Sequence, residues 1–160
     1  MIARGLLLVA VVSCCSQAAV TQLSSELQQH LRQERFDTVT SIRGLPLGVR
    51  GALQTLFASM EYDVQRDIAQ PGAPFQGTGS YGQANLPLRR LIAAECSQDH
   101  CLVYYERGGR TLTCHAVLFH WEPEATRFEA GGLAPRRLAT IAEVWKALLS
   151  GALKDSTKQW

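Results

Sequence analysis

Apolar residues recur at helical spacing in three segments of this chain. Three leucines lie four residues apart among polar neighbours: Leu23, Leu27 and Leu31. This spacing predicts an amphipathic helix over 21–33.

A second helix is predicted from Pro46, because proline is tolerated in a first helical turn. Its apolar face holds Val49, Leu53, Leu56, Phe57 and Met60. A third predicted helix opens near Pro135 and is closed by Gly151. Its apolar face holds Leu138, Ile141, Trp145, Leu148 and Leu149.

Residues 90–132 alternate apolar and polar side chains, which predicts a meander of antiparallel strands. Gly108 and Gly109 are expected to form a two-residue hairpin turn, so that Val103 would face Cys114. The core side of the sheet would then hold Ile92, Ala94, Cys96, Cys101, Val103, Tyr105, Leu112, Cys114, Ala116 and Leu118. The wetter side would hold Glu95, Leu102, Tyr104, Glu106, Thr111, Thr113, His115, Val117 and Phe119.

Together these elements predict an α+β fold, a four-stranded antiparallel β-meander with N-terminal helices and a C-terminal helix packed on one face. The last hairpin departs from simple alternation. A loop over 122–125 would turn Arg127 and Glu129 toward the core, so a bulge or another loop length is expected there.

The segment 61–87 is rich in glycine and proline, which predicts a long loop between the helices and the sheet. Long loops inside compact domains often carry function, so this segment is a candidate binding surface. Its aromatic residues Phe75 and Tyr81 are the candidate contact residues.

The N-terminus is predicted to be an export signal. An uncharged apolar run over 5–12 follows one arginine, which is typical of a secretory signal over 1–18. Two processing routes stay open: lipidation at Cys14 within a lipoprotein-type box, or cleavage after Ala18 by an ordinary signal peptidase. Either route places a single domain over 19–151, with a flexible tail over 152–160, in the periplasm or outside the cell. Only lipidation at Cys14 would attach the chain to a membrane.

Composition and charge exclude several classes of protein. The chain has 160 residues, of which 46% are apolar, so it is neither a disordered chain nor long enough for more than about one domain. Sixteen basic against 14 acidic residues give a net charge of +2. Like charges adjoin only in pairs, which argues against nucleic-acid binding. No internal apolar run reaches the roughly 20 residues of a transmembrane helix.

Three cysteines lie beyond the signal: Cys96, Cys101 and Cys114. A four-residue loop over 97–100 would place Cys96 directly opposite Cys101, so these two are predicted to form a disulfide. Cys114 would stay reduced and buried. A zinc site that adds His100 to the three thiols is the less favoured alternative, because the ligand spacing is loose and export favours oxidation.

The sequence contains no nucleophile elbow, zinc-protease helix motif, phosphate loop or dinucleotide fingerprint. Weak candidates for acid/base chemistry are Glu95, Tyr104 and His115, which the predicted register places on the wetter sheet face. Cys114 cannot share a proton with His115, because adjacent strand residues point to opposite faces. No metal ligand set and no cofactor are predicted.

Four stretches, at 67–76, 86–92, 105–109 and 115–119, resemble segments of small exported bacterial proteins. The resemblance covers about residues 62–119 and implies a bacterial envelope protein, without assigning site residues. We therefore expect a non-catalytic binding or interaction module with a protein or small-molecule partner in the cell envelope. The alternative is a small hydrolase-like envelope enzyme that uses the acid/base group on the sheet face.

Overall fold

The computed structural model describes residues 23–58, 67–77, 85–122, 124–156 and 160. The predicted export signal, Cys14, Met60 and Tyr81 lie outside the described residues. The described elements, in chain order, are α1 (Ser25–Gln33), β1 (Asp37–Val39), the 3-10 turn η1 (Ile42–Gly44), α2 (Leu47–Ala58), β2 (Ile68–Ala69), β3 (Arg89–Cys96), β4 (His100–Arg107), β5 (Thr113–Trp121), β6 (Thr126–Leu133) and α3 (Ile141–Leu149).

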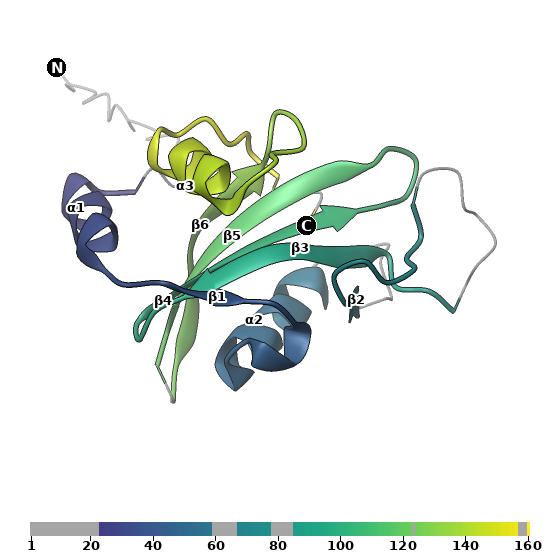
Figure 1. Cartoon of the computed structure of the whole chain (residues 1–160), viewed down its shortest axis with the longest axis horizontal. Helices are drawn as coiled ribbons and strands as arrows, with labels where there is room; N and C mark the ends of the chain where they lie inside the picture. Colours follow the sequence, from purple (N-terminus) through teal and green to yellow (C-terminus); the bar gives the residue numbers. More distant parts are fainter. Residues whose placement is uncertain (1–22, 59–66, 78–84, 123, 157–159) are drawn as a thin grey trace, which may run out of the picture.

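The strands form one sheet in the order β1-β3-β4-β5-β6, in which each neighbouring pair is antiparallel (Figure 1). The short strand β2 adds to β3 in parallel. The predicted α+β class and the antiparallel meander are confirmed. Among the described residues, none of the helices has the length and apolar character needed to cross a membrane.

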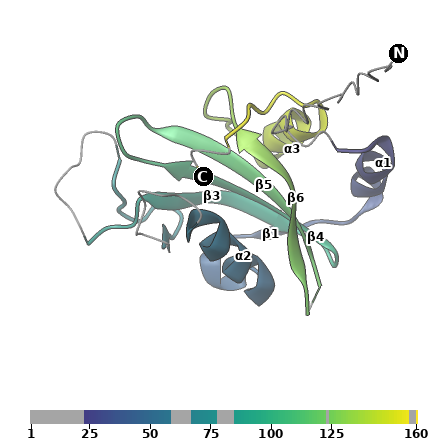
Figure 2. The same ribbon diagram turned by 180° about the vertical axis from the view of Figure 1, so that it is seen from behind.

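The sheet is buried on both faces, whereas the sequence predicted helices on one face only. Helices α1 and α3 pack on one face, and α2 packs on the other (Figures 1 and 2). Strand β4 shows the consequence most clearly, because every residue from His100 to Glu106 is buried. Alternation of apolar and polar residues therefore could not identify a wet face, since the sheet has none at its centre.

The register between β4 and β5 differs from the predicted one by an odd number of residues. Val103 lies opposite Val117 rather than Cys114. Because side chains alternate across a strand, an odd shift exchanges the two faces of one strand relative to its neighbour. Val103 consequently packs under α2, whereas Cys114 packs under α3, and Leu112 is 39% exposed instead of buried.

Gly108 explains why the glycine pair does not make the expected tight turn. A Cβ at Gly108 would lie 1.5 Å from the carbonyl oxygen of Gln76, so the missing side chain lets the 75–77 segment approach the sheet. The amide of Gly108 donates to the carbonyl of Leu88. Gly109 has φ +122°, a conformation that favours glycine. The glycines thus join the loop to the sheet.

The two flanking hairpins follow the sequence expectations. Cys96 lies opposite Cys101 and the two form a disulfide, while Cys114 is buried and reduced. In the last hairpin Phe119 faces Phe128, and the register shifts between Phe119 and Leu118. This shift is the expected bulge.

Glu106, which the sequence placed on the wetter side, is 1% exposed and joins three parts of the chain. Its carboxylate accepts hydrogen bonds from Arg90, at 2.7 Å, and from Arg137, at 2.8 Å. The guanidinium of Arg90 also donates to the carbonyl of Ala73 and lies over the ring of Phe75. One buried carboxylate therefore fixes the 73–75 loop and the segment before α3 against the sheet.

Part of the predicted flexible tail over 152–160 is described by the structure, at 152–156 and 160, and these residues include contacts with the sheet and its core. Gly151, with φ +70°, ends α3, and the next amide returns to the carbonyl of Ala147 in a Schellman arrangement. Lys154 then pairs with Leu133. Trp160 is 6% exposed and joins the α2-side core. These contacts were not visible in the sequence because the segment is too short for a periodic pattern.

Candidate functional site

A groove of about 530 Å³ lies between α2 and the β5–β6 hairpin. Ala52 and Leu56 of α2 form one wall, and Phe119 and Phe128 of the hairpin form the other. Phe119 is fully buried, while Phe128 is 39% exposed, so the groove deepens from an aromatic edge toward the sheet. Its volume lies in the range of ordinary small-molecule sites.

The rim of the groove is acidic and its inner wall carries one unsatisfied hydroxyl. Glu122 and Glu124, both exposed, come from the hairpin and line the opening. Thr126 lines it too, and its buried Oγ1 has no hydrogen-bond partner within the described part of the chain. This oxygen has no accessible surface and lies close to the backbone of Gly48, so the polar groups that a bound molecule would meet are those of the acidic rim.

Gly48 sets the position of α2 at one end of the groove. A Cβ at this position would lie 2.2 Å from the Thr126 hydroxyl, so a larger residue would require the Thr126 side chain to move. The apolar stripe of α2 then divides into two parts. Val49, Leu53 and Phe57 are buried against the sheet, whereas Leu56 is half-buried and faces the groove.

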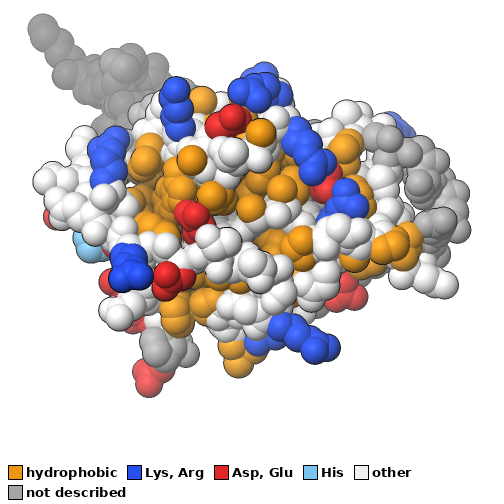
Figure 3. All heavy atoms as spheres, viewed as in Figure 1, with side chains coloured by type: hydrophobic (Ala, Val, Ile, Leu, Met, Phe, Trp, Pro, Cys, Tyr) orange, Lys and Arg blue, Asp and Glu red, His pale blue; other side chains and the backbone are white. Residues whose placement is uncertain are grey.

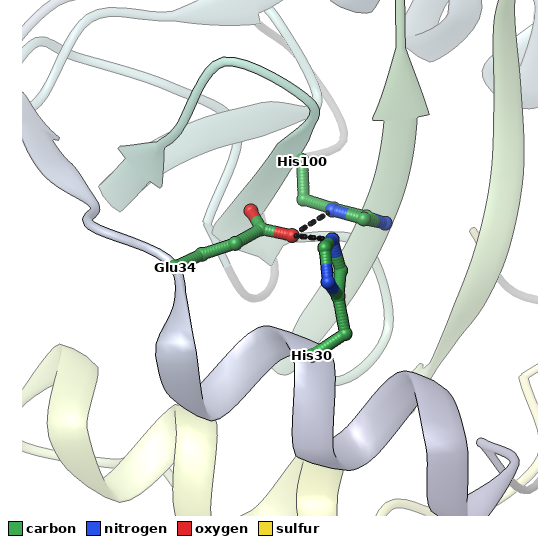
Figure 4. A group of neighbouring side chains, drawn as sticks. All are labelled: His30, Glu34 and His100. Atoms are coloured by element: carbon green, nitrogen blue, oxygen red, sulfur yellow. Dashed lines mark hydrogen bonds and ion pairs between the residues drawn. The ribbon is translucent and has the colours of Figure 1, made fainter.

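A second candidate site lies where the end of α1 meets the β3–β4 hairpin. Glu34 follows the last helical residue, and its Oε1 is 2.8 Å from Nε2 of His30 and 2.6 Å from Nδ1 of His100 (Figure 4). The three potential ligand atoms all lie within 4.8 Å of one another. Of the described residues, these form the group whose side chains could hold a metal ion.

The environment of this cluster is graded from buried to exposed. The His100 side chain is 3% exposed, Glu34 is 10% exposed, and His30 is 54% exposed. The hydroxyl of Ser97 donates to the second carboxylate oxygen of Glu34. The ring of His120 lies 5.1 Å from that of His100, so three of the four histidines in the chain lie together.

The structure does not bring the acid/base candidates Glu95, Tyr104 and His115 together. Glu95 accepts a 2.8 Å hydrogen bond from the Trp145 indole, and the Tyr104 hydroxyl accepts one of 2.8 Å from the Leu138 amide. Burial raises the pKa of Tyr104 above its ordinary value. Both side chains therefore hold the α3 region in place.

His115 lies on the opposite face of the sheet, under α2. It is fully buried, stacks on Tyr105 and hydrogen-bonds the hydroxyl of Thr113 through Nε2. Burial, reinforced by the positive charges of Arg107 and Arg89, lowers the pKa of His115 to about 3. A histidine that stays neutral and has no route to solvent is poorly placed for acid/base chemistry on the sheet face.

The loop candidate Phe75 packs against Arg90, as described above, so its ring is held on the sheet. Charged side chains of both signs are interspersed on the face drawn in Figure 3, which agrees with the absence of charge runs in the sequence. That surface offers no single-sign field for a polyanion.

Neither candidate site was predicted from the sequence, which offered His100 only as a zinc ligand beside three thiols. The local signal for the observed cluster is the four-residue spacing from His30 to Glu34, which places both on one side of a helix. The groove left no signal because its walls come from α2 and a distant hairpin.

No family model matches this chain, and no curated protein or solved structure was found to be similar to it. Functional inference therefore rests on the geometry of the two candidate sites.

Proposed function

We propose that this chain is an exported binding protein of the bacterial cell envelope that captures a small molecule with an apolar body and a cationic end. The observation that carries the proposal is the groove between α2 and the β5–β6 hairpin. The apolar run over 5–12 supports export, and the Cys96–Cys101 disulfide is typical of proteins from oxidising compartments.

The walls of the groove favour an apolar body. Phe119 and Phe128 meet edge to face with ring centroids 6.5 Å apart, and Leu56 faces them from α2. Apolar surface buried against such walls contributes about 25 cal/mol per Å². A chain of several methylene groups would gain most of its affinity here.

The rim favours a positive end. Glu122 and Glu124 both line the opening, and neither is paired with Lys or Arg in any salt bridge of the described residues. Glu122 lies 3.7 Å from His120, a contact that is ionic only when the histidine is protonated. An ammonium group at the opening would therefore meet two carboxylates, whereas a carboxylate would be repelled.

The enzymatic alternative has no comparable support. Its candidate residues Glu95, Tyr104 and His115 lie on two different faces of the sheet, and no observation assigns them a shared substrate. We therefore do not propose a hydrolase.

The test uses three probes of one length: octylammonium, octanol and octanoate. We expect octylammonium to bind most tightly in isothermal titration and octanoate most weakly. Ala52→Phe should fill the groove and weaken octylammonium binding at least about tenfold, which is about 1.4 kcal/mol. Glu122→Gln combined with Glu124→Gln should leave octanol binding unchanged and remove the preference for the cation.

Thr113→Ser is a matched control for these variants, because Thr113 lies on β5 and does not line the groove. It should bind octylammonium like the wild type. Equal affinity of the three probes in the wild type would contradict the acidic-rim argument. Unchanged octylammonium binding by Ala52→Phe would place the site elsewhere.

A further inference from the structure

We propose that His30, Glu34 and His100 bind one divalent transition-metal ion, with Zn²⁺ as the best-suited ion. The site joins α1 to the β3–β4 hairpin on the α1/α3 face of the sheet (Figure 4). It does not rest on the proposed groove function, because the groove lies under α2 on the opposite face.

The donor set carries the first part of the argument. Two imidazole nitrogens and one carboxylate oxygen are ligands that suit Zn²⁺ and its neighbours in the first transition row. Mg²⁺ and Ca²⁺ prefer oxygen ligands, so two histidines argue against them. Three protein ligands leave at least one position for water.

The present geometry is close to that of a bound state. Ligand bonds of about 2.0 Å in a tetrahedral site separate the ligand atoms by roughly 3.3 Å. The oxygen of Glu34 now lies 2.8 Å from His30 and 2.6 Å from His100, as expected for hydrogen bonds. To admit an ion, the Glu34 oxygen has to lie about 0.7 Å farther from the His100 nitrogen and about 0.5 Å farther from the His30 nitrogen. His30 can move by this amount, because its side chain is 54% exposed.

The other two ligands are oriented by neighbouring groups. Ser97 donates to the carboxylate oxygen of Glu34 that does not contact the histidines, and its hydroxyl accepts the amide of His100 at 2.8 Å. The disulfide from Cys101 to Cys96 closes the hairpin directly beside His100. A partner that orients the carboxylate and a braced hairpin are the kind of support that metal ligands require.

A purely structural role accounts for less of this arrangement. The contact from Glu34 to His100 would by itself fasten the end of α1 to the hairpin. The additional contact from His30 adds little stability, because this side chain is 54% exposed and ion pairs with a solvated partner are weak. Stability alone therefore does not explain why the His30 imidazole contacts the same oxygen of Glu34 as His100 does. A metal site explains it, because all of its ligand atoms must lie close together.

The experiment uses the untagged mature protein, as it is purified from cells after processing. Bound metal is removed with a chelator, and no reductant is added, so that the disulfide stays closed. Titration with Zn²⁺ should show one equivalent bound, and Co²⁺ should give visible absorption bands of a nitrogen- and oxygen-ligated ion. Glu34→Gln and His100→Gln should each weaken Zn²⁺ binding at least about 100-fold. Zn²⁺ should raise the melting temperature of the wild type and not that of the variants, because it binds only the folded state.

Two further variants keep the test decisive. His30→Gln changes an exposed side chain, so it should fold even if a buried variant does not, and it too should lose high-affinity Zn²⁺ binding. His120→Gln removes a nearby histidine outside the ligand group and should keep Zn²⁺ binding within a few-fold of the wild type. Absence of Zn²⁺ binding in the wild type, retained binding in His30→Gln, or loss of binding in His120→Gln equal to that in His100→Gln would each overturn the proposal.

Discussion

The two faces of the sheet are covered in different ways. On one face α1 and α3 together shield the sheet, and their apolar side chains form a continuous core with the strands. Of the α-helices in the described part of the chain, α2 alone packs on the other face, and Trp160 covers part of what remains. Where neither reaches, at the β5–β6 hairpin, the groove opens. A face covered by one 12-residue helix therefore retains space for a ligand, because the sheet extends beyond the helix.

Histidine residues also have different roles on the two faces of the sheet. On the α2 face His115 is enclosed, with aromatic contacts to Tyr105 and Trp160. On the α1/α3 face His30 and His100 converge on a carboxylate at the edge of the core. The same residue type thus serves as a packing element on one face and as a candidate ligand on the other.

The largest expected effect tests whether both faces are core. Leu102 and Val103 are adjacent on β4, point to opposite faces and are both fully buried. Leu102→Asp and Val103→Asp should each cost more than about 4 kcal/mol, since each buries an unpaired charge, and should abolish the cooperative thermal transition measured by circular dichroism.

The neighbouring exposed position offers a matched control. Leu112→Asp changes a side chain that is 39% exposed and should retain the wild-type transition. A wild-type melt for either Leu102→Asp or Val103→Asp would show that its face is not core.

A smaller effect, dependent on pH, tests how dry the α2 face is. The pKa of His115 is about 3 in the folded protein, against about 6.5 when unfolded. Between these values the unfolded state binds the additional proton, so stability is complete above about pH 6.5 and falls as the pH is lowered toward 3. The slope approaches about 1.4 kcal/mol per pH unit.

His115→Gln should remove this contribution, so the free energy of unfolding of the variant should change less steeply between pH 6.5 and pH 5. Denaturant titrations at several pH values measure both slopes. The other histidines are common to both proteins and cancel in the comparison. Parallel slopes would mean that His115 exchanges its proton freely in the folded state.

The smallest effect concerns how α3 is attached to its face. Trp145→Phe removes the indole N–H that donates to Glu95, and should cost about 1–2 kcal/mol in urea unfolding. The same substitution in a Glu95→Ala background should cost less, because the acceptor is already absent. Equal costs in the two backgrounds would show that the hydrogen bond does not stabilise α3.

The sequence was sufficient for elements whose pattern is local. The three helices were predicted, although α3 begins at Ile141 rather than near Pro135. The β3–β4 hairpin was predicted because Cys96 and Cys101 flank a four-residue loop. The β4–β5 register was not predicted correctly. Gly108 is required by the close approach of the Gln76 backbone, which is distant in the sequence, and not by a tight turn of its own hairpin. Because side chains on both faces of the sheet are buried, the pattern of apolar residues did not reveal the error in this register.

The candidate sites were beyond the sequence for a related reason. His30 and His100 are 70 positions apart, and they meet only because Leu31 anchors α1 in the core beside the hairpin. The sequence placed His100 in the 97–100 loop, and the structure makes it the first residue of β4. What could not be read was the packing of one element on the other, which depends on the shapes of many side chains together.

The buried carboxylate of Glu106 has a consequence for how this protein can diverge. Arg90 and Arg137 both depend on it, and loss of one partner of a buried ion pair typically costs about 3–5 kcal/mol because a charge is left uncompensated. Substitution of Glu106 alone would therefore be strongly destabilising, whereas the Arg137 side chain is 56% exposed and its loss leaves Arg90 to pair with Glu106. Homologues are expected to keep Glu106 and Arg90 together or to have exchanged both, whereas position 137 can vary by itself.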